Sequence, residues 1–281
     1  MGAGIAQACA QSGYRTIVRE VNDTSCDKAR AAIEKSFDKA IERGKATVDA
    51  KADALAHLEF TTDIGALANA GIIIEAVVES LDVKRQLFAE LDARCPAETI
   101  FASNTSSLTI TEIAAATKRA DRFVGLHFFN PVPVMTLVEV VRALRTSDAT
   151  VDRAVAFAKS LGKEPILAKD NSGFVVNLLL VPYMIDAIRA LESGIASIAD
   201  IDTGMRLGAG HPMGPFTLLD FVGLDTVYKI AEIMFTEYRE ARYAPPPLLK
   251  RMVLAGWYGK KSGMGFYNYA VTPPVPNDLG I

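Results

Sequence analysis

The chain is poor in cysteine and has no large excess of charge of either sign. Its 281 residues include three cysteines, Cys9, Cys26 and Cys95, an odd number without the spacing of a metal site or a disulfide framework. The formal net charge is −3, and the charged residues are spread along the chain, so neither nucleic acid nor an anionic membrane is expected as a partner. These features predict reduced thiols, no bound metal and a cytoplasmic location.

Long apolar runs are also missing. The longest one, residues 174–185, is interrupted by Asn177 and is too short to span a bilayer. No cleavable signal precedes the first helical pattern. Half of the residues are hydrophobic and 22% are charged, which is the composition of a globular protein with one large domain or two smaller ones. We therefore expect a soluble intracellular protein.

Helical and strand patterns alternate over residues 1–170, as in a parallel sheet with crossover helices. Helices are predicted over residues 4–12, 23–43, 48–56, 81–95, 109–117 and 151–161, and strands over 16–20, 60–62, 72–77, 100–103, 123–129, 137–141 and 164–168. From Phe174 onward only helical periodicity is found, and the last ten residues look frayed. The expected class is α/β, with a sheet domain over 1–170 and a smaller all-helical domain over 171–281.

The chain opens with residues that look like the end of a dinucleotide-binding G-x-G-x-x-G fingerprint (MGAGIA, residues 1–6). Glycines in this motif let backbone N–H groups approach a pyrophosphate at a helix N-terminus. Glu20 closes the next strand and could accept both ribose hydroxyls of NAD. The first strand and the first two glycines of the fingerprint are missing, which would leave two neighbouring strands of the sheet without a partner. An ordinary glycine-containing helix start is an equally good interpretation of this segment alone.

One of the three histidines, His127, lies inside an apolar strand pattern over residues 124–129. If residues 130–136 connect two antiparallel strands, pairing that is symmetric about Pro133 places Glu139 opposite His127. A carboxylate that faces an imidazole fixes its tautomer and stabilises its charged form, as a general base requires. A structural ion pair is the alternative interpretation.

Two more polar groups occupy positions where a substrate could meet them. Ser106 lies in a run of hydroxyl and amide side chains that follows a buried strand, at the sheet edge where doubly wound folds bind ligands. Some of these residues could instead cap the next helix. Asn177 is expected four residues into the first helix of the second domain, where an unpartnered amide would be costly. It could reach a substrate carbonyl, or it could be satisfied within its own helix.

Several longer stretches match one known family almost letter for letter. They are residues 102–108 (ASNTSSL), 126–135 (LHFFNPVPVM), 137–140 (LVEV) and 208–215 (GAGHPMGP), flanked by 1–6 and 259–267 (GKKSGMGFY). On these stretches the chain resembles the L-3-hydroxyacyl-CoA dehydrogenase family, of the 3-hydroxybutyryl-CoA dehydrogenase type, over nearly its whole length. The resemblance implies a doubly wound Rossmann domain that binds NAD, apparently without its first strand. It also implies a helical domain that binds substrate and forms a homodimer.

The resemblance implies the chemistry as well, which is NAD-dependent oxidation of a short-chain L-3-hydroxyacyl-CoA to the 3-oxoacyl-CoA. His127 would take the proton of the 3-hydroxyl, Glu139 would hold and polarise His127, Ser106 would hydrogen-bond the reacting oxygen, and Asn177 would position the substrate. The implied NAD contacts are Gly2, Glu20, Glu79, Lys84, Ser106, Asn130 and Lys261. The implied acyl-CoA contacts are Ser36, Arg43, Ser106 and Asn177, with Lys45 as a possible substitute for Arg43.

The chain departs from the family pattern in the hinge, at Asn171-Ser172, and at Leu178, where the family often has proline and arginine. His211 falls in a loop where the family tolerates other residues, and we interpret it as structural. Two alternative functions stay open on the sequence. The first is dehydrogenation of a free hydroxy acid or sugar acid. The second is a chain that folds without holding NAD, which the missing strand would favour.

Overall fold

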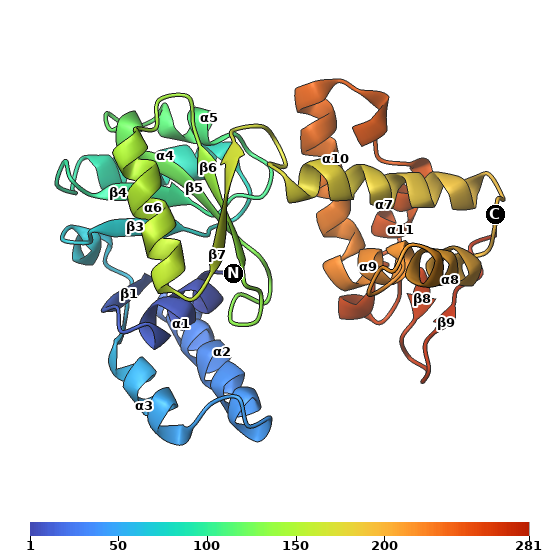
Figure 1. Ribbon diagram of the computed structural model, residues 1–281, viewed down its shortest axis with the longest axis horizontal. Coiled ribbons are helices and arrows are strands. Elements are labelled where there is room, and N and C mark those ends of the chain that lie inside the picture. The colour runs from blue at the N-terminus through green and yellow to red at the C-terminus, as the bar shows by residue number, and fades with distance from the viewer. Residues whose placement is uncertain (281) are drawn as a thin grey trace. The chain divides into compact units, whose positions relative to one another are not determined.

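Residues 1–280 are described by the computed structural model, in which the chain divides into two units, Met1–Asn171 and Ser172–Ile281 (Figure 1). The helices of the first unit are α1 (Gly2–Gln11), α2 (Asp23–Glu42), α3 (Val48–Ala56), α4 (Leu81–Asp92), α5 (Ile110–Ala114) and α6 (Asp148–Ser160). Short 3-10 turns, η1 (Ile64–Leu67) and η2 (Ala120–Arg122), lie between them. The long α2 begins after Asn22, whose side-chain oxygen accepts the backbone N–H of Ser25 as the expected N-cap.

The strands of the first unit form two separate sheets. One contains β3 (Ile72–Glu75), β4 (Ile100–Ser103), β5 (Phe123–Phe128), β6 (Leu137–Arg142) and β7 (Glu164–Lys169), in that order. The other contains β1 (Thr16–Arg19) and β2 (Leu58–Thr61). All pairs are parallel except β5–β6, whose direct connection reverses the chain. The predicted α/β class with a mostly parallel sheet is confirmed.

Helices cover both faces of the larger sheet, and strand alternation decides which residues each face presents. The side chains of Val124 and Leu126 pack with α1 and α6 residues such as Ile5 and Ala154. On the opposite face, Phe88 of α4 stacks on aromatic rings of β4 and β5. Gly125 also lies on that face, where an added Cβ would come within 2.6 Å of Val141 and 2.9 Å of Ile110. Glycine at this position therefore lets α5 lie close against β5.

The second unit is built from α7 (Val176–Glu192), α8 (Ile198–Gly208), α9 (Pro215–Val222), α10 (Leu224–Tyr238) and α11 (Pro247–Leu254), with 3-10 turns η3 (Ala241–Tyr243) and η4 (Lys260–Ser262). These helices surround their own apolar core, in which Ile188, Phe216 and Phe266 are fully buried. No helix within residues 1–280 is long and apolar enough to cross a membrane.

Two local expectations for this unit are corrected. A two-residue antiparallel pair, β8 (Tyr267–Asn268) with β9 (Val275–Pro276), is present where only helices and a frayed end were predicted, because strands this short leave no alternating pattern. Helix α7 begins at Val176 rather than at Phe174, since Gly173 and Phe174 both have positive φ angles, 82° and 49°. Asn177 is therefore the second residue of α7 and not the fourth.

Candidate active site

The centre of the candidate site is a buried imidazole–carboxylate pair on two neighbouring antiparallel strands. His127 of β5 pairs directly with Glu139 of β6, which confirms the register expected from symmetry about Pro133. The His127 Nδ1 and a Glu139 carboxylate oxygen are 2.6 Å apart, and the two side chains are 5% and 0% exposed. Because a carboxylate only accepts hydrogen bonds, Nδ1 carries the proton and Nε2 is left as an acceptor.

Ser106 meets the second nitrogen of this imidazole from the loop that follows β4. Its hydroxyl oxygen lies 3.1 Å from His127 Nε2 and donates to it. The same loop is fastened to β5 by Asn104, whose side-chain oxygen accepts the backbone N–H of Phe128 at 2.8 Å. The predicted residues Ser106, His127 and Glu139 therefore form one hydrogen-bonded array, in which the carboxylate can stabilise a proton gained at Nε2.

Glu79 is the hub that shapes the serine loop. One carboxylate oxygen accepts the hydroxyl of Thr105 at 2.5 Å, the backbone N–H groups of Ser106 at 3.1 Å and Ser107 at 3.3 Å, and the Ser107 hydroxyl at 3.0 Å. Burial by itself would raise the pKa of Glu79, but the nearby Lys84 ammonium and these hydrogen bonds lower it below its ordinary value. Glu79 is thus held as an anion that fixes the backbone carrying Ser106.

Lys84 lies beneath this hub rather than at the surface. Its side chain is 1% exposed, and its ammonium is 2.7 Å from Glu75 and 3.2 Å from Glu79. The second Glu75 oxygen accepts the Ser103 hydroxyl at 2.6 Å. Two carboxylates around one buried ammonium satisfy its charge. This placement suits a role in holding the loop more than direct contact with a cofactor, and the NAD contacts expected of Lys84 and Glu79 stay predictions.

The residues expected at the nucleotide lie at the ends of α1, β1 and β5. Gly2 begins α1, and an added Cβ there would lie 3.7 Å from that of Ala76. No side chain caps this ten-residue helix, so its first N–H groups and the positive end of its dipole suit a pyrophosphate. Glu20 follows β1 with a half-buried carboxylate, and Asn130 is exposed beyond β5. These residues fit NAD in charge and in hydrogen-bonding capacity.

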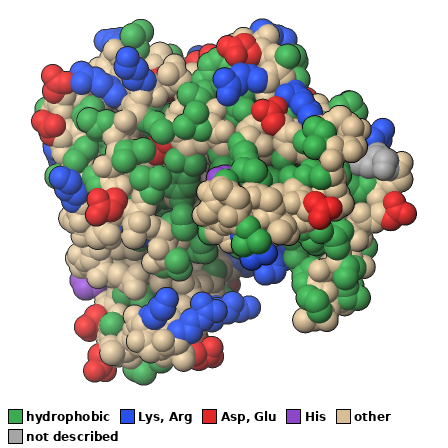
Figure 2. Space-filling view, turned by 45° about the vertical axis from the view of Figure 1, so that its right-hand side comes forward, with side chains coloured by type: hydrophobic (Ala, Val, Ile, Leu, Met, Phe, Trp, Pro, Cys, Tyr) green, Lys and Arg blue, Asp and Glu red, His purple; other side chains and the backbone are tan. Residues whose placement is uncertain are grey.

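The residues expected at the CoA portion lie on α2. Ser36 is half-buried in this helix, and Arg43 is exposed at its C-cap. Figure 2 shows Lys and Arg side chains gathered in a row over the part of the unit that α2 and α3 form. The exposed cations of α2 and the following turn are Lys28, Arg30, Lys35, Lys39, Arg43 and Lys45. Such a row could attract the phosphates of a CoA thioester.

Three further residues named in the sequence analysis lie in the second unit. Asn177 is half-buried in the first turn of α7. Lys261 lies in η4, where its ammonium is 2.5 Å from Asp225. His211 Nδ1 is 3.1 Å from the hydroxyl of Tyr183, a contact that agrees with a structural role for this histidine.

Sequence reasoning missed three polar residues that hold the site in place. Two of them are Glu75 and Asn104. Each is a polar residue directly at the end of an apolar strand pattern, and this position is the signal that could have indicated them. Asp170 is the third, since its carboxylate accepts the backbone N–H groups of Ile110 at 2.6 Å and Thr111 at 2.7 Å. It caps α5, sixty positions earlier in the chain, and only the fold brings these residues together.

A Rossmann-type sheet with a carboxylate-supported imidazole at its edge defines the class as a nucleotide-dependent dehydrogenase. Comparison with known families gives the finer assignment. The NAD-binding domain of 3-hydroxyacyl-CoA dehydrogenase matches residues 1–171, and the C-terminal domain of the same enzyme matches residues 173–269. The chain therefore belongs to the 3-hydroxyacyl-CoA dehydrogenase family, and the predicted NAD-dependent oxidoreductase class is confirmed.

Individual relatives agree with this family along nearly the whole chain. A 3-hydroxybutyryl-CoA dehydrogenase of Mycobacterium tuberculosis is 49% identical over 271 residues, which cover 96% of this chain and 95% of the relative. The mitochondrial hydroxyacyl-coenzyme A dehydrogenase of Homo sapiens is 46% identical over 276 residues, covering 96% and 88%. The crystal structure of (S)-3-hydroxybutyryl-CoA dehydrogenase PaaH1 from Ralstonia eutropha superposes with a TM-score of 0.91 at 45% identity, covering 96% of this chain and 95% of that one.

Proposed function

We propose that this chain oxidises the 3-hydroxyl of a short-chain L-3-hydroxyacyl-CoA, such as 3-hydroxybutyryl-CoA, with NAD. The observation that carries the proposal is the array Ser106–His127–Glu139, with its 3.1 Å and 2.6 Å contacts. The names of the relatives supply the substrate class. The exposed cations along α2 agree with an anionic CoA thioester.

In this proposal, His127 acts as the general base. Its Nε2 takes the proton of the substrate hydroxyl, while Glu139 keeps Nδ1 protonated and stabilises the imidazolium that results. Ser106 lies at the same nitrogen, so its hydroxyl can hydrogen-bond the substrate oxygen and orient it toward the imidazole. Asn177 is proposed to position the acyl carbonyl. NAD, when bound through Gly2, Glu20 and Asn130, supplies the acceptor for the hydride that leaves C3.

The test is the reverse reaction, followed as NADH absorbance at 340 nm with acetoacetyl-CoA. We expect turnover of the thioester, and little or none with free acetoacetate at the same concentration. Reduction of the free acid without reduction of the thioester would instead support a dehydrogenase of free hydroxy acids. Absence of both activities, together with no quenching in an NADH fluorescence titration, would support a chain that does not hold the cofactor.

We further propose a homodimer formed through the second unit and a cytoplasmic location. Exposed apolar side chains on that unit support the dimer: Leu179, Ile195, Leu207, Phe221 and Leu254. Three free cysteines support a reducing compartment. Light scattering after size exclusion should give about twice the monomer mass of 30.2 kDa, and a monomer at all concentrations would contradict the dimer. Cell fractionation tests the location.

A further inference from the structure

The connecting loop, residues 129–136, joins β5 to β6. It therefore runs from the strand that carries His127 to the strand that carries Glu139. It also contains Asn130, which the function proposed above assigns to NAD. Because both strands end in this loop, its position affects the imidazole–carboxylate pair and the cofactor together.

Lys163 fastens this loop through two of its carbonyl groups. The ammonium donates to the carbonyl oxygen of Val132 at 2.7 Å and to that of Met135 at 2.8 Å. Because an ammonium has three donors, one side chain can hold both sides of the turn within the loop. Hydrogen bonds from a charged donor are also stronger than those between neutral groups.

The local sequence fixes where the Lys163 side chain begins. Gly162 follows α6 with a φ angle of 67°, and the N–H of Lys163 then donates to the carbonyl of Ala158 at 3.1 Å, as in helices that end at glycine. The next residue, Glu164, begins β7 and donates its N–H to the carbonyl of Thr136 at 2.8 Å. Lys163 therefore lies between a helix end and a strand start, directly beside the connecting loop.

The ammonium of Lys163 is partly removed from water. Its residue is half-buried, and burial lowers the pKa of the ammonium below its ordinary value. A lysine at a protein surface usually buries its apolar stem and keeps the charged group in water. The charged group of Lys163 instead lies against two backbone carbonyls, which indicates a role in holding the loop.

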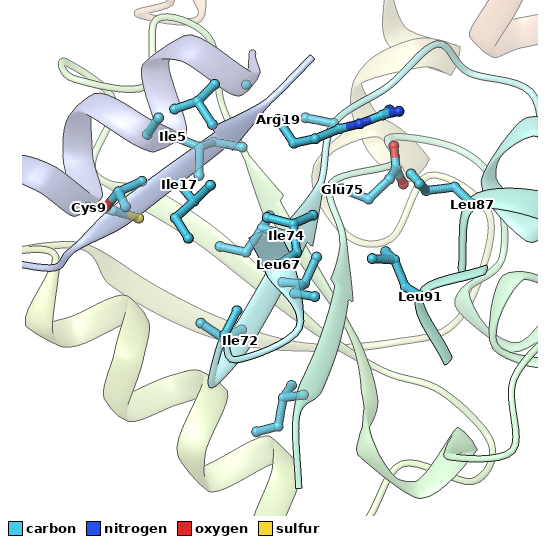
Figure 3. Close-up of a pocket in the computed structure, with 18 of the residues that line it drawn as sticks. Ile5, Cys9, Ile17, Arg19, Leu67, Ile72, Ile74, Glu75, Leu87 and Leu91 are labelled. Carbon is cyan, nitrogen blue, oxygen red and sulfur yellow. The ribbon is translucent and has the colours of Figure 1, made fainter. Parts of the chain in front are cut away.

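The connecting loop in turn packs against the first turn of α1. Val132 is 2% exposed, and a Cβ added to Gly4 would come within 3.1 Å of the Val132 Cβ and 3.6 Å of the Pro133 Cδ. Elsewhere on the same helix, Ile5 and Cys9 border a pocket of about 1440 Å³ (Figure 3). Close packing of this first turn therefore depends on the connecting loop.

We propose that Lys163 is a positioning residue for the dehydrogenase reaction. By holding the connecting loop, it keeps Asn130 and the first turn of α1 in the arrangement that NAD requires. The inference rests on the function proposed above. The hydrogen bonds among Ser106, His127 and Glu139 do not involve Lys163, so loss of its ammonium should weaken cofactor binding more than proton transfer.

The kinetic test compares Lys163→Met with Lys159→Met. Methionine keeps the apolar stem and removes the donors, and Lys159 is an exposed residue one turn earlier in the chain, at the end of the same helix. We expect Lys163→Met to raise the KM for NADH by about tenfold, with kcat at saturating NADH changed by less than about threefold. Lys159→Met should match the unchanged protein. Equal KM values in both variants, or a loss of kcat at unchanged KM, would overturn the assignment.

Restoring the ammonium provides a rescue. In Lys163→Cys, alkylation with 2-bromoethylamine creates a side chain of nearly the same length as lysine with an ammonium at its end, while the three native cysteines are buried. We expect a raised KM for NADH before alkylation and recovery of most of the difference afterwards. The unchanged protein, treated in the same way, serves as the control. A variant that gains the aminoethyl group by mass spectrometry without recovering its KM would contradict the proposal.

Hydrogen exchange gives a readout that needs neither cofactor nor turnover. The N–H groups of Val134 and Met135 donate to the carbonyl of Pro131, at 2.9 Å and 3.0 Å, within the turn that Lys163 fastens. In Lys163→Met, peptides that cover residues 129–136 should exchange faster by about tenfold, while peptides from α2 should be unchanged. Unchanged exchange in the loop, or faster exchange throughout the unit, would overturn the proposal.

Failure of this inference and failure of the proposed function give different results. If the unchanged chain does not reduce acetoacetyl-CoA, the proposed function fails, and NADH fluorescence titration together with hydrogen exchange still decides the role of Lys163. If the chain reduces acetoacetyl-CoA and Lys163→Met has an unaltered KM for NADH, the function stands and the role of Lys163 is lost. A chain that does not bind NADH at all would overturn both.

Discussion

Each unit of the molecule buries carboxylates among polar partners, and the partners differ in kind. In the first unit, Glu139 meets an imidazole and Glu79 meets an ammonium and the loop of Ser106. In the second unit, Asp202 accepts the backbone N–H groups of Phe216 and Thr217, at 2.8 Å and 3.0 Å. The carboxylates of the first unit hold a proton-accepting imidazole and the loop that contacts it. The carboxylate of Asp202 fixes the first turn of α9.

Asp220 shows that the carboxylates of the second unit have a structural role. Its carboxylate accepts the backbone N–H groups of Phe266 at 2.9 Å and Tyr267 at 2.8 Å. The Tyr267 hydroxyl in turn donates to Asp202 at 2.9 Å, so the two aspartates fasten the β8 segment to α8 and α9. A Cβ on Gly265 would come within 2.0 Å of Asp220, which shows how closely the chain is packed there.

Burial alone therefore does not mark a functional carboxylate. The informative feature is whether the hydrogen-bond partners of the carboxylate do more than complete a turn of the chain. Backbone N–H groups and tyrosine hydroxyls close turns, whereas an imidazole whose second nitrogen remains an acceptor does not. By this criterion we propose that Glu139 takes part in the chemistry, that Glu79 acts through the loop of Ser106, and that Asp202 and Asp220 stabilise the fold. Substitutions at the site of the first unit should therefore change activity, whereas substitutions of the carboxylates in the second unit should change stability.

The largest effect is expected from His127→Gln. Loss of this group should lower kcat by roughly 10²–10⁴-fold, because glutamine can neither take up the proton of the substrate hydroxyl nor donate it in the reverse reaction. Thermal unfolding should change little, since the amide can still hydrogen-bond Glu139. Stopped-flow or steady-state assays with acetoacetyl-CoA measure the first quantity, and calorimetry measures the second.

The matched control for this substitution is His57→Gln. The ring of His57 hydrogen-bonds the backbone carbonyl of Asp53, outside the Ser106–His127–Glu139 array, so kcat should stay within a factor of about two. If the two histidine variants retained equal activity, His127 would not be the base.

Asp202→Ala should lower stability and leave kcat unchanged, which is the reverse of the result expected for His127→Gln. The substitution leaves the N–H groups of Phe216 and Thr217 without their acceptor, and each buried unsatisfied group costs about 1–3 kcal/mol. We expect the free energy of unfolding to fall by roughly 2–4 kcal/mol, while kcat of the folded fraction is unchanged. Asp186→Ala, which removes an exposed pair with Arg189, is the control and should cost less than about 1 kcal/mol. A large loss of kcat at unchanged stability would place Asp202 in the chemistry.

Glu79→Gln should give a smaller effect on activity. The neutral amide keeps the shape of the hub but weakens its hold on the N–H groups of Ser106 and Ser107, and it leaves Lys84 with one carboxylate fewer. We expect kcat to fall by about 10–50-fold with little change in KM. Glu90→Gln changes an exposed residue of α4 that pairs with Arg94, and it should not alter kcat. If kcat were unchanged and only stability fell, Glu79 would belong with the structural carboxylates.

Sequence patterns predicted the site where it depends on local pairing. The register of His127 with Glu139 follows from a short connection whose centre is visible in the sequence, because a one-residue slip would turn every side chain to the other face. The location of Ser106 at the carboxyl end of β4 follows from the parallel-sheet topology.

The sequence could not predict features that depend on partners far along the chain. Asp170 caps α5 across sixty positions, and Glu75, Lys84 and Ser103 meet only after β3, α4 and β4 are packed. Lys84 was expected at the cofactor, and nothing in its sequence surroundings shows that it lies between two carboxylates. The start of α7 was misplaced because a left-handed conformation at Phe174 is rare for an aromatic residue.

The last expected effect concerns the pH dependence of stability. Burial raises the pKa of Asp220 from 3.8 to about 6, although hydrogen bonds from Tyr267, Phe266 and Tyr269 oppose this and Asp202 adds to it. Between pH 4 and 6 the folded chain therefore holds a proton that the unfolded chain has released. The free energy of unfolding contributed by this group is complete below about pH 4 and falls as the pH rises to about 6.

Asp220→Asn isolates this contribution, because an amide does not titrate in that range. The stability of the unchanged protein minus that of the variant should decrease by roughly 1–3 kcal/mol between pH 4 and 6, at about 1.4 kcal/mol for each unit of pKa difference. Urea unfolding at a series of pH values measures it. A difference that grows with pH would mean that the N–H and hydroxyl donors outweigh burial and that Asp220 is ionised throughout. The second unit would then contain a buried ionised carboxylate, as the first unit does at Glu79.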